Sequence, residues 1–335
     1  MEWRERVRIR FITALVTSVV LFLPLFAFAG GVNNEPLGAE DYLIGVAPPP
    51  SIAGKVYLVW YHATKAKDNS GDTVKLRSVG DGALDKINVF VEVNRILWIT
   101  PFKFQVGGFD GFLNAHAVFP FVKGNLHVDA LTPGGVIDAV DESHSGLSDV
   151  TVGPGIAWHH KSGFLHGITG LDIVAPTGKW NRFRNFNVGN NVWTIAPVLI
   201  FTVFPPFYPN IDISMKFDYS FNTKNDDFLG PSGFKTHKTP GQEFHFDYDV
   251  MHSIWGGKPG MQVRGGIGGY FYQQTTKDKS GDPSFEDHYG RVFAIGPAVF
   301  FDYKMWIFSA HVYWETLAKN RSEGVRSQLT ILCKF

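Results

Sequence analysis

The stretch from Ile211 to Asn222, IDISMKFDYSFN, alternates apolar and polar side chains without a break. Its odd positions are apolar or aromatic, and its even positions are polar or charged. A helix would scatter these residues around its circumference, whereas a β-strand places them on two opposite faces. The stretch therefore predicts a β-strand with one apolar and one polar face.

The same period of two recurs along most of the chain. Each alternating segment has about 9 to 13 residues, close to the roughly 9–11 that a tilted strand needs to cross a bilayer. Strands of soluble proteins average about five or six residues. We expect an all-β, antiparallel, up-and-down transmembrane β-barrel of about 12 strands, with ten or fourteen left open. The expected strands lie near 56–63, 88–98, 112–122, 148–158, 163–174, 191–203, 210–222, 241–252, 260–273, 291–302, 306–316 and 324–335.

The connections between these segments alternate in length, which supports the barrel independently. In outer-membrane barrels the periplasmic turns are short and the extracellular loops are long. The connections expected outside the cell are mostly long and rich in Gly, Asp, Asn, Ser and Lys. They lie near 64–87, 123–147, 175–190, 223–240, 274–290 and 317–323. The connections expected on the periplasmic side are mostly short, and lie near 99–111, 159–162, 204–209, 253–259 and 303–305.

Two tryptophans indicate which face meets lipid. Trp306 and Trp314 bracket three apolar residues on one face of their strand. Eight residues at about 3.3 Å each, tilted by about 40°, span roughly 20 Å. This approaches the apolar band of about 25 Å, flanked by aromatic girdles, of membrane barrels. A soluble β-sandwich with two core tryptophans is the alternative.

The last strand ends in an aromatic residue. Phe335 closes the chain, and Leu329, Ile331 and Cys333 precede it at alternate positions. This pattern resembles the recognition signal of outer-membrane barrels, so we expect the barrel-assembly machinery to bind the C-terminal strand. Cys333 is expected on the apolar face as an inert thiol.

The first 29 residues have the composition of a secretory signal peptide. Four arginines between positions 4 and 10 precede an apolar run that ends in Ala27-Phe28-Ala29, a small-x-small cleavage pattern. An uncleaved anchor is the alternative, since the run approaches the roughly 20 residues of a spanning helix. We expect a signal peptide at 1–29, a periplasmic or plug segment at 30–54 that can enter the lumen, and an outer-membrane barrel at 55–335.

Composition excludes several other classes of protein. The 335 residues include 31 Lys and Arg, 31 Asp and Glu, 15% aromatic residues and one cysteine. Disordered chains have few aromatics and a net charge. A nucleic-acid partner is excluded because no basic excess is present to displace counterions. A single cysteine permits no internal disulfide.

Polar residues on the inner faces of the strands are the candidate functional residues. They would line the lumen and either brace the wall as ion pairs or guide a substrate. The lumen-facing candidates are Lys216, Asp218, Glu243, His245, Asp247, Asp249, Arg264, His311, Glu315 and Arg326.

Estimated hairpin positions predict how these charges pair. Lys216 is expected opposite Asp247, and Asp218 opposite His245. The following hairpin places Arg264 beside Asp247. The last hairpin, between the strands near 306–316 and 324–335, places Glu315 opposite Arg326.

Catalytic and metal-binding motifs are absent from the sequence. It has no Gly-x-Ser-x-Gly, His-Glu-x-x-His or phosphate-binding glycine loop. His159 and His160 are adjacent, so they point to opposite faces of a strand. A lipid-cleaving barrel needs a Ser–His pair on the outward face, but most strand histidines are expected to face inward. We expect no enzyme activity, no metal and no cofactor.

Six motifs in order resemble the outer-membrane family labelled for the meta-pathway of phenol degradation. They cover nearly the whole chain after the signal peptide. The motifs are GLSDV at 146–150, DIVAPTG at 172–178, NVGNNVW at 187–193, GQE at 241–243, GGYFYQQ at 268–274 and GRVFAIGP at 290–297.

This resemblance implies a channel in the bacterial outer membrane for small hydrophobic or aromatic compounds such as phenols. Lipopolysaccharide hinders apolar solutes, and a lumen with interleaved aromatic and polar groups gives them a desolvated path. The expected partners are outer-membrane lipid and small apolar solutes. A barrel-embedded lipid hydrolase and a structural or surface-binding barrel are the alternatives.

Overall fold

The structure is a computed structural model that describes residues 31–335 except Asn33, Asp41, 74–85, 133–134, Pro209, 259–260, 286–288 and Phe335. The predicted signal peptide lies outside these residues and stays a prediction. Within the described part of the chain, no helix is long and apolar enough to cross a membrane. The strands are β1 (Ser51–Lys67), β2 (Lys86–Val106), β3 (Phe109–Thr132), β4 (Gly135–Leu147), β5 (Val150–His160), β6 (Leu165–Ala175), β7 (Thr194–Val203), β8 (Ile211–Asn222), β9 (Asn225–Leu229), β10 (Lys235–Thr239), β11 (Glu243–Lys258), β12 (Met261–Gln274), β13 (Lys279–Ser280), β14 (Arg291–Tyr303), β15 (Trp306–Lys319) and β16 (Arg321–Lys334).

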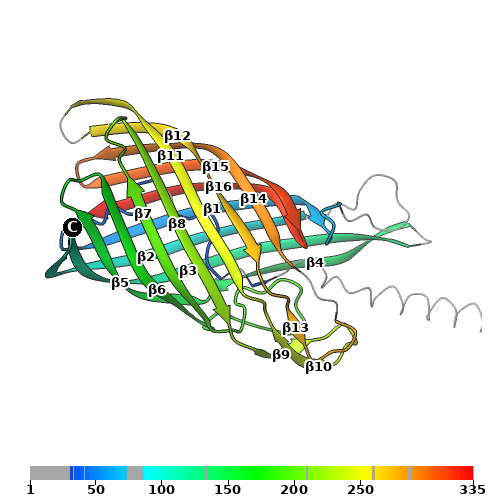
Figure 1. Cartoon of the computed structure of the whole chain (residues 1–335). Coiled ribbons are helices and arrows are strands. Elements are labelled where there is room, and N and C mark those ends of the chain that lie inside the picture. The colour runs from blue at the N-terminus through cyan, green and yellow to red at the C-terminus, as the bar shows by residue number, and fades with distance from the viewer. Residues whose placement is uncertain are drawn as a thin grey trace, which may run out of the picture.

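A closed ring of 12 antiparallel strands forms the body of the molecule (Figure 1). Neighbouring strands of the ring are consecutive in sequence, except where β4, β9, β10 and β13 intervene. The ring closes because β1 pairs with both β2 and the C-terminal β16. The three short strands β13, β10 and β9 form a separate sheet. The predicted up-and-down barrel of about twelve strands is confirmed.

The connections divide between the two ends of the barrel. The short turns lie at the end that carries the C-terminus, and β4, β9, β10 and β13 lie at the other end (Figure 1). The predicted alternation of short periplasmic and long extracellular connections therefore holds. We call the two ends the periplasmic end and the outer end.

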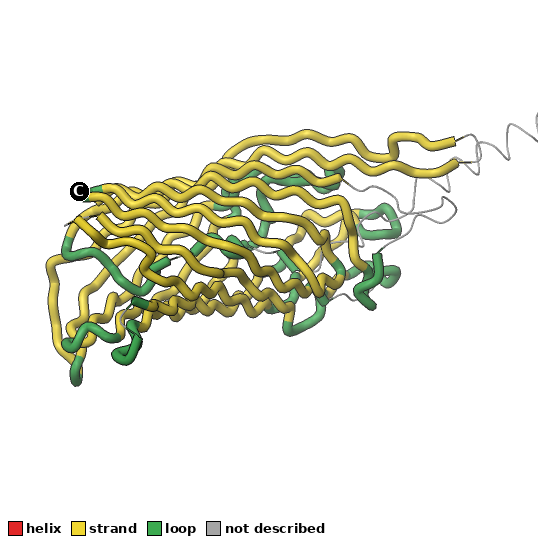
Figure 2. The backbone as a smooth tube through the Cα atoms, turned by 90° about the horizontal axis from the view of Figure 1, so that it is seen from above, coloured by secondary structure: helices red, strands yellow, loops and turns green. Residues whose placement is uncertain are grey.

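Several predicted connections are partly wrong, because the strands run further than their polarity indicates. The predicted turn at 253–259, for example, is strand as far as Lys258. The predicted loop at 99–111 contains only a tight turn at Gly107 and Gly108. The loop at 123–147 is a hairpin in which β4 pairs with the outer half of β3, from Phe121 to Thr132. Both views show this hairpin projecting beyond the other strands (Figures 1 and 2). The loop at 317–323 reduces to a turn at Asn320, whose φ of 47° is left-handed.

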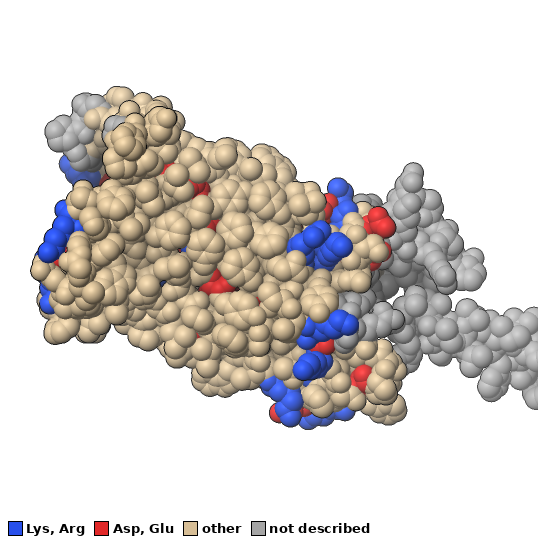
Figure 3. Space-filling model, viewed as in Figure 1, with Lys and Arg blue, Asp and Glu red and all other residues tan. Residues whose placement is uncertain are grey.

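An apolar band covers the outer wall of the barrel. Trp306 and Trp314 on β15 are 43% and 52% exposed, whereas His311 between them is 3% exposed. Lysine and arginine side chains gather at the two ends and leave the band between them largely uncharged (Figure 3). A continuous apolar band on the outer wall is unfavourable in water and favourable in lipid. The barrel therefore lies in the bacterial outer membrane, with its apolar faces toward lipid.

We predict that Ala310→Arg, in the middle of this band, lowers the free energy of unfolding by about 2–4 kcal/mol, because the guanidinium then faces hydrocarbon. Thr316→Arg, near the outer end of the same strand, is the matched control and costs about 0–1 kcal/mol. Urea titration of the barrel folded into lipid vesicles measures both values. Equal costs at the two positions would contradict the assignment of the band.

Candidate functional site

The predicted lumen residues lie on the inner face of the barrel wall. Nine of the ten are buried, and Arg326 is partly buried. Their function in transport stays a prediction. They occupy one side of the ring: Lys216 and Asp218 on β8, Glu243, His245, Asp247 and Asp249 on β11, Arg264 on β12, His311 and Glu315 on β15, and Arg326 on β16.

Two of the predicted charge pairs are confirmed by the strand register. Lys216 lies opposite Asp247, and Asp218 lies opposite His245. His245 bridges two carboxylates: its Nδ1 lies 2.8 Å from Asp218 Oδ2 and its Nε2 lies 2.5 Å from Asp247 Oδ1. The contact with Asp218 ties β11 to β8 across the inner face, as expected of an ion pair that braces the wall, whereas Asp247 lies on β11 itself.

The other two predicted pairs are wrong. Arg264 lies opposite Ser253 and forms an ion pair with Asp212. The estimate failed because β11 continues to Lys258 before the chain turns. In the last hairpin Arg326 lies opposite Tyr313. Glu315 Oε2 instead accepts a hydrogen bond of 2.8 Å from the amide of Gly324.

The segment 31–50 passes through the lumen from the outer end to the periplasmic start of β1. Near the outer end, the amide of Val32 donates to Glu243 Oε1 at 2.6 Å. Midway, the amides of Gly38 and Glu40 donate to the two carboxylate oxygens of Asp247, at 2.7 and 3.1 Å. Near the periplasmic end, the amide of Gly45 donates to Thr202. The predicted boundary of this segment at residue 54 stays a prediction, and β1 begins at Ser51.

Two acidic side chains attach this segment to basic residues of the wall. Glu35 Oε2 lies 3.1 Å from Lys216 Nζ. Glu40 contacts Lys55 Nζ at 3.3 Å and also forms an ion pair with Arg95. The Glu35–Lys216 pair is buried and the pairs of Glu40 are largely buried, so loss of one partner would leave an unpaired charge.

Apolar contacts hold the segment against the β12–β15 side of the lumen. Leu37 belongs to a buried cluster with Tyr270 and Tyr313. The ring of Tyr42 packs against Phe300, with 3.5 Å between the centroids. The segment thus fills one side of the barrel.

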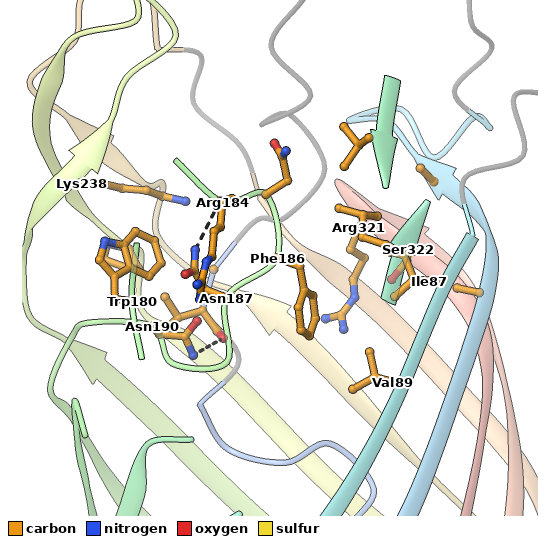
Figure 4. A pocket seen from close by; sticks show the side chains of 18 of the residues that line it. Ile87, Val89, Trp180, Arg184, Phe186, Asn187, Asn190, Lys238, Arg321 and Ser322 are labelled. Atoms are coloured by element: carbon orange, nitrogen blue, oxygen red, sulfur yellow. Dashed lines mark hydrogen bonds between the residues drawn. The ribbon is translucent and has the colours of Figure 1, made fainter. Parts of the chain in front are cut away.

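A cavity of about 490 Å³, which we call the outer cavity, lies between this segment and the opposite wall near the outer end. Figure 4 shows Ile87 and Val89 of β2 on one side, and Trp180 and Lys238 on the other. Phe186 projects between these two sides, toward Arg321 of β16. Aliphatic and aromatic side chains therefore share this space with basic groups.

The connection between β6 and β7 forms one wall of the outer cavity, and Asp149 fixes it in place. The carboxylate of Asp149 accepts hydrogen bonds from the amides of Gly178 and Asn190, at 2.8 and 2.7 Å. Burial raises the pKa of Asp149, although these two hydrogen bonds lower it. Gly178 also approaches Gly189 so closely that an added Cβ would lie 2.7 Å from the Gly189 Cα. Glycine is required at this crossing.

A second space of about 90 Å³, the inner cavity, continues along the same strands. Tyr61 and Val89 pair in the strand register and line the outer cavity, and Val59 and Val91 pair next and line the inner one. The two cavities therefore follow one another along the β1–β2 wall.

Polar groups lie at the far side of the inner cavity. Arg95 NH2 contacts His116 Nδ1 at 3.3 Å, and His116 Nε2 lies 3.2 Å from Asp172 Oδ1. Glu40 of the lumen segment also lines this cavity. A solute that follows the valines thus meets a compact group of acidic and basic side chains.

Sequence reasoning missed this wall, because in the outer half of β2 the apolar residues face the lumen and the polar residues face outward. Val89, Val91 and Val93 point inward, while Glu92 and Asn94 point outward. The expectation of polar residues inside therefore assigned no lumen residue to β2. The reversal itself, valine alternating with polar residues in 88–94, is the signal that marks an apolar inner wall.

The fold and the lumen define the class of protein, an outer-membrane β-barrel partly filled by its own N-terminal segment. The chain belongs to the family described as "Putative MetA-pathway of phenol degradation", whose model matches residues 64–331. A comparison with curated proteins gives no match.

The barrel is similar to the COG4313 outer membrane channel from Pseudomonas putida F1. The TM-score is 0.66 at 16% identity, over 89% of this chain and 100% of that chain. The β-domain of the Bordetella autotransporter BrkA has a TM-score of 0.47 at 10% identity, over 85% of this chain and 100% of that one. The transport unit of the autotransporter AIDA-I from Escherichia coli has a TM-score of 0.47 at 12% identity, over 95% and 97%. The first likeness supports the fold.

We predict that Glu40→Ala loosens the lumen segment, because Lys55 and Arg95 lose their carboxylate. Removing one partner of a buried ion pair costs about 3–5 kcal/mol. Ionic conductance of the barrel in planar bilayers should therefore rise. Glu323→Ala, which removes a carboxylate that also has lysine partners but lies at the outer rim, is the control. The same conductance in both variants would mean that Glu40 does not hold the segment.

Proposed function

We propose that the barrel is a channel through which small apolar or aromatic solutes, such as phenols, cross the outer membrane. The observation that carries this proposal is the apolar wall of β1 and β2, which lines two successive cavities beside the lumen segment. Water-filled porin channels have polar interiors, whereas valine side chains line both successive cavities of this barrel. Membership of a family named for phenol degradation agrees with this solute class.

The outer cavity is large enough for a small aromatic ring, and the inner cavity is smaller than such a ring needs. A cavity of about 150 Å³ lined by aliphatic and aromatic residues binds benzene, and the outer cavity is larger than this at about 490 Å³. The inner cavity, at about 90 Å³, is smaller. A ring therefore enters the outer cavity directly and passes the inner one as side chains change rotamer, which makes the inner cavity the selective step.

The remaining partners follow from the fold. We propose that the apolar band binds outer-membrane lipid and that the C-terminal strand is bound by the barrel-assembly machinery, although Phe335 itself lies outside the described residues. We also propose that the protein is not an enzyme. Its buried His245 and His311 lie on the inner face of the wall, away from the lipid that a hydrolase would cleave.

Val91→Trp tests the channel. The indole fills the inner cavity, and we expect uptake of radiolabelled phenol by cells that express the variant to fall to a tenth or less of the wild-type contribution. Val299→Trp, on the lipid-facing side where Val299 is 47% exposed, adds the same bulk outside the lumen and should leave uptake unchanged.

Two results would decide against the proposal. Equal uptake in both variants would show that solutes do not pass the inner cavity. If cells with and without the wild-type gene take up phenol equally, the structural or surface-binding barrel becomes the better interpretation.

A further inference from the structure

The outer cavity is basic as well as apolar. Among the described residues, its lining contains five basic residues and no aspartate or glutamate. Four aromatic side chains line the same space, namely those of Tyr61, Trp180, Phe186 and Phe228. A neutral hydrocarbon would gain nothing from the charges, so the lining fits a ligand with both an aromatic ring and a negative charge. The basic residues are Lys65, Arg182, Arg184, Lys238 and Arg321.

Arg321 is a basic residue of this set with a donor that the protein itself leaves unsatisfied. Its Nε is buried and has no hydrogen-bond partner in the protein, and its guanidinium lies over the ring of Tyr272 at 4.8 Å. Arg182 and Lys238 by contrast form ion pairs of 2.8 Å with aspartates. A buried donor without an acceptor is unfavourable, and a charged acceptor relieves this.

A vacant guanidinium donor also occurs in the inner cavity, although the lining of that cavity includes the carboxylates of Glu35, Glu40 and Asp172. Arg326 and Arg95 both line it, and the Nε of each is buried without a hydrogen-bond partner in the protein. Arg321 and Arg326 lie on the same strand, β16. One guanidinium with a vacant donor therefore lines the outer cavity, and two line the inner cavity.

A nearby carboxylate does not satisfy these arginines. Glu315 receives hydrogen bonds of 2.7 Å from the hydroxyls of Tyr61 and Tyr270, in addition to the Gly324 amide. No ion pair to Arg321 or Arg326 occurs within the described ranges of the chain. Glu315 thus accepts from other donors. Arg326 NH2 donates to Gln328 Oε1 at 3.2 Å, but the Nε of each guanidinium still lacks an acceptor and can donate to an external anion.

We propose that the lumen binds and passes aromatic monocarboxylates, with Arg321 and Arg326 as successive carboxylate-binding residues. This inference rests on the proposed channel function and narrows its solute class. A guanidinium binds a carboxylate through two parallel hydrogen bonds. The ring of the ligand lies against Phe186, Ile87 and Val89 in the outer cavity, where Figure 4 shows these side chains near Arg321.

Equilibrium binding of radiolabelled benzoate to the purified barrel in detergent tests the proposal. We expect Arg321→Gln and Arg326→Gln each to weaken benzoate binding about tenfold, the loss expected for one charge-assisted contact. Binding of benzyl alcohol, a neutral ligand with the same ring, should change less than twofold. Arg321→Lys keeps the charge but loses the paired donors, so it should lie between wild type and Arg321→Gln.

Arg291→Gln is the matched control. Arg291 lies near the outer end of β14, and its Nε donates to the carbonyl of Leu317 at 3.2 Å. Its neighbours Val292 and Ala294 are buried, which places Arg291 outside the alternating inner face. Heat-modifiable migration on gels verifies that each variant is folded.

The outcomes separate this inference from the channel itself. Equal benzoate affinity in all three glutamine variants would overturn the role of Arg321 and Arg326. If cells take up benzyl alcohol through the barrel but the barrel binds no benzoate, the carboxylate inference fails and the channel stands. Uptake of neither compound through the barrel would contradict the channel.

Discussion

A chain in lipid must pair every backbone amide and carbonyl within the protein, and this constraint determines the rest of the molecule. The ring is complete because β16 returns to pair with β1, which leaves no open edge toward the hydrocarbon. The outward side chains must then be apolar, as Trp306 and Trp314 are. Charged residues such as Lys216 and Asp247 consequently collect inside, where each needs a partner.

The lumen segment supplies many of those partners. Asp247 accepts hydrogen bonds from two backbone amides of the segment. Lys216 forms an ion pair with Glu35, and Arg95 forms one with Glu40. These contacts and the apolar cluster around Leu37 hold the segment against one side of the barrel. The valines of β2 on the other side remain in contact with cavities. The segment thereby narrows the lumen to a path whose wall is apolar, with three arginines beside it.

Alternation predicted the strands and the inner-face charges of β8 and β11 because period two is a local property of the sequence. Register is less local, and it failed where a strand continued past its polar residues, as β11 does beyond Ser253. The valine wall was missed because 88–94 reverses the usual polarity. Arg95 and Glu40 could not be paired from the sequence, since they are 55 residues apart and meet only when the segment folds into the ring.

In the proposed channel, solutes pass beside the lumen segment while it stays in place. A disulfide between cysteines substituted for Leu37 and Val292, two members of one buried cluster, would lock the segment to β14, with Cys333→Ser as background and mass spectrometry to verify the bond. We expect uptake of labelled phenol to be the same in the oxidised and the reduced protein. Loss of uptake on oxidation, with recovery on reduction, would show that the segment must leave the lumen and would rule out a path beside it.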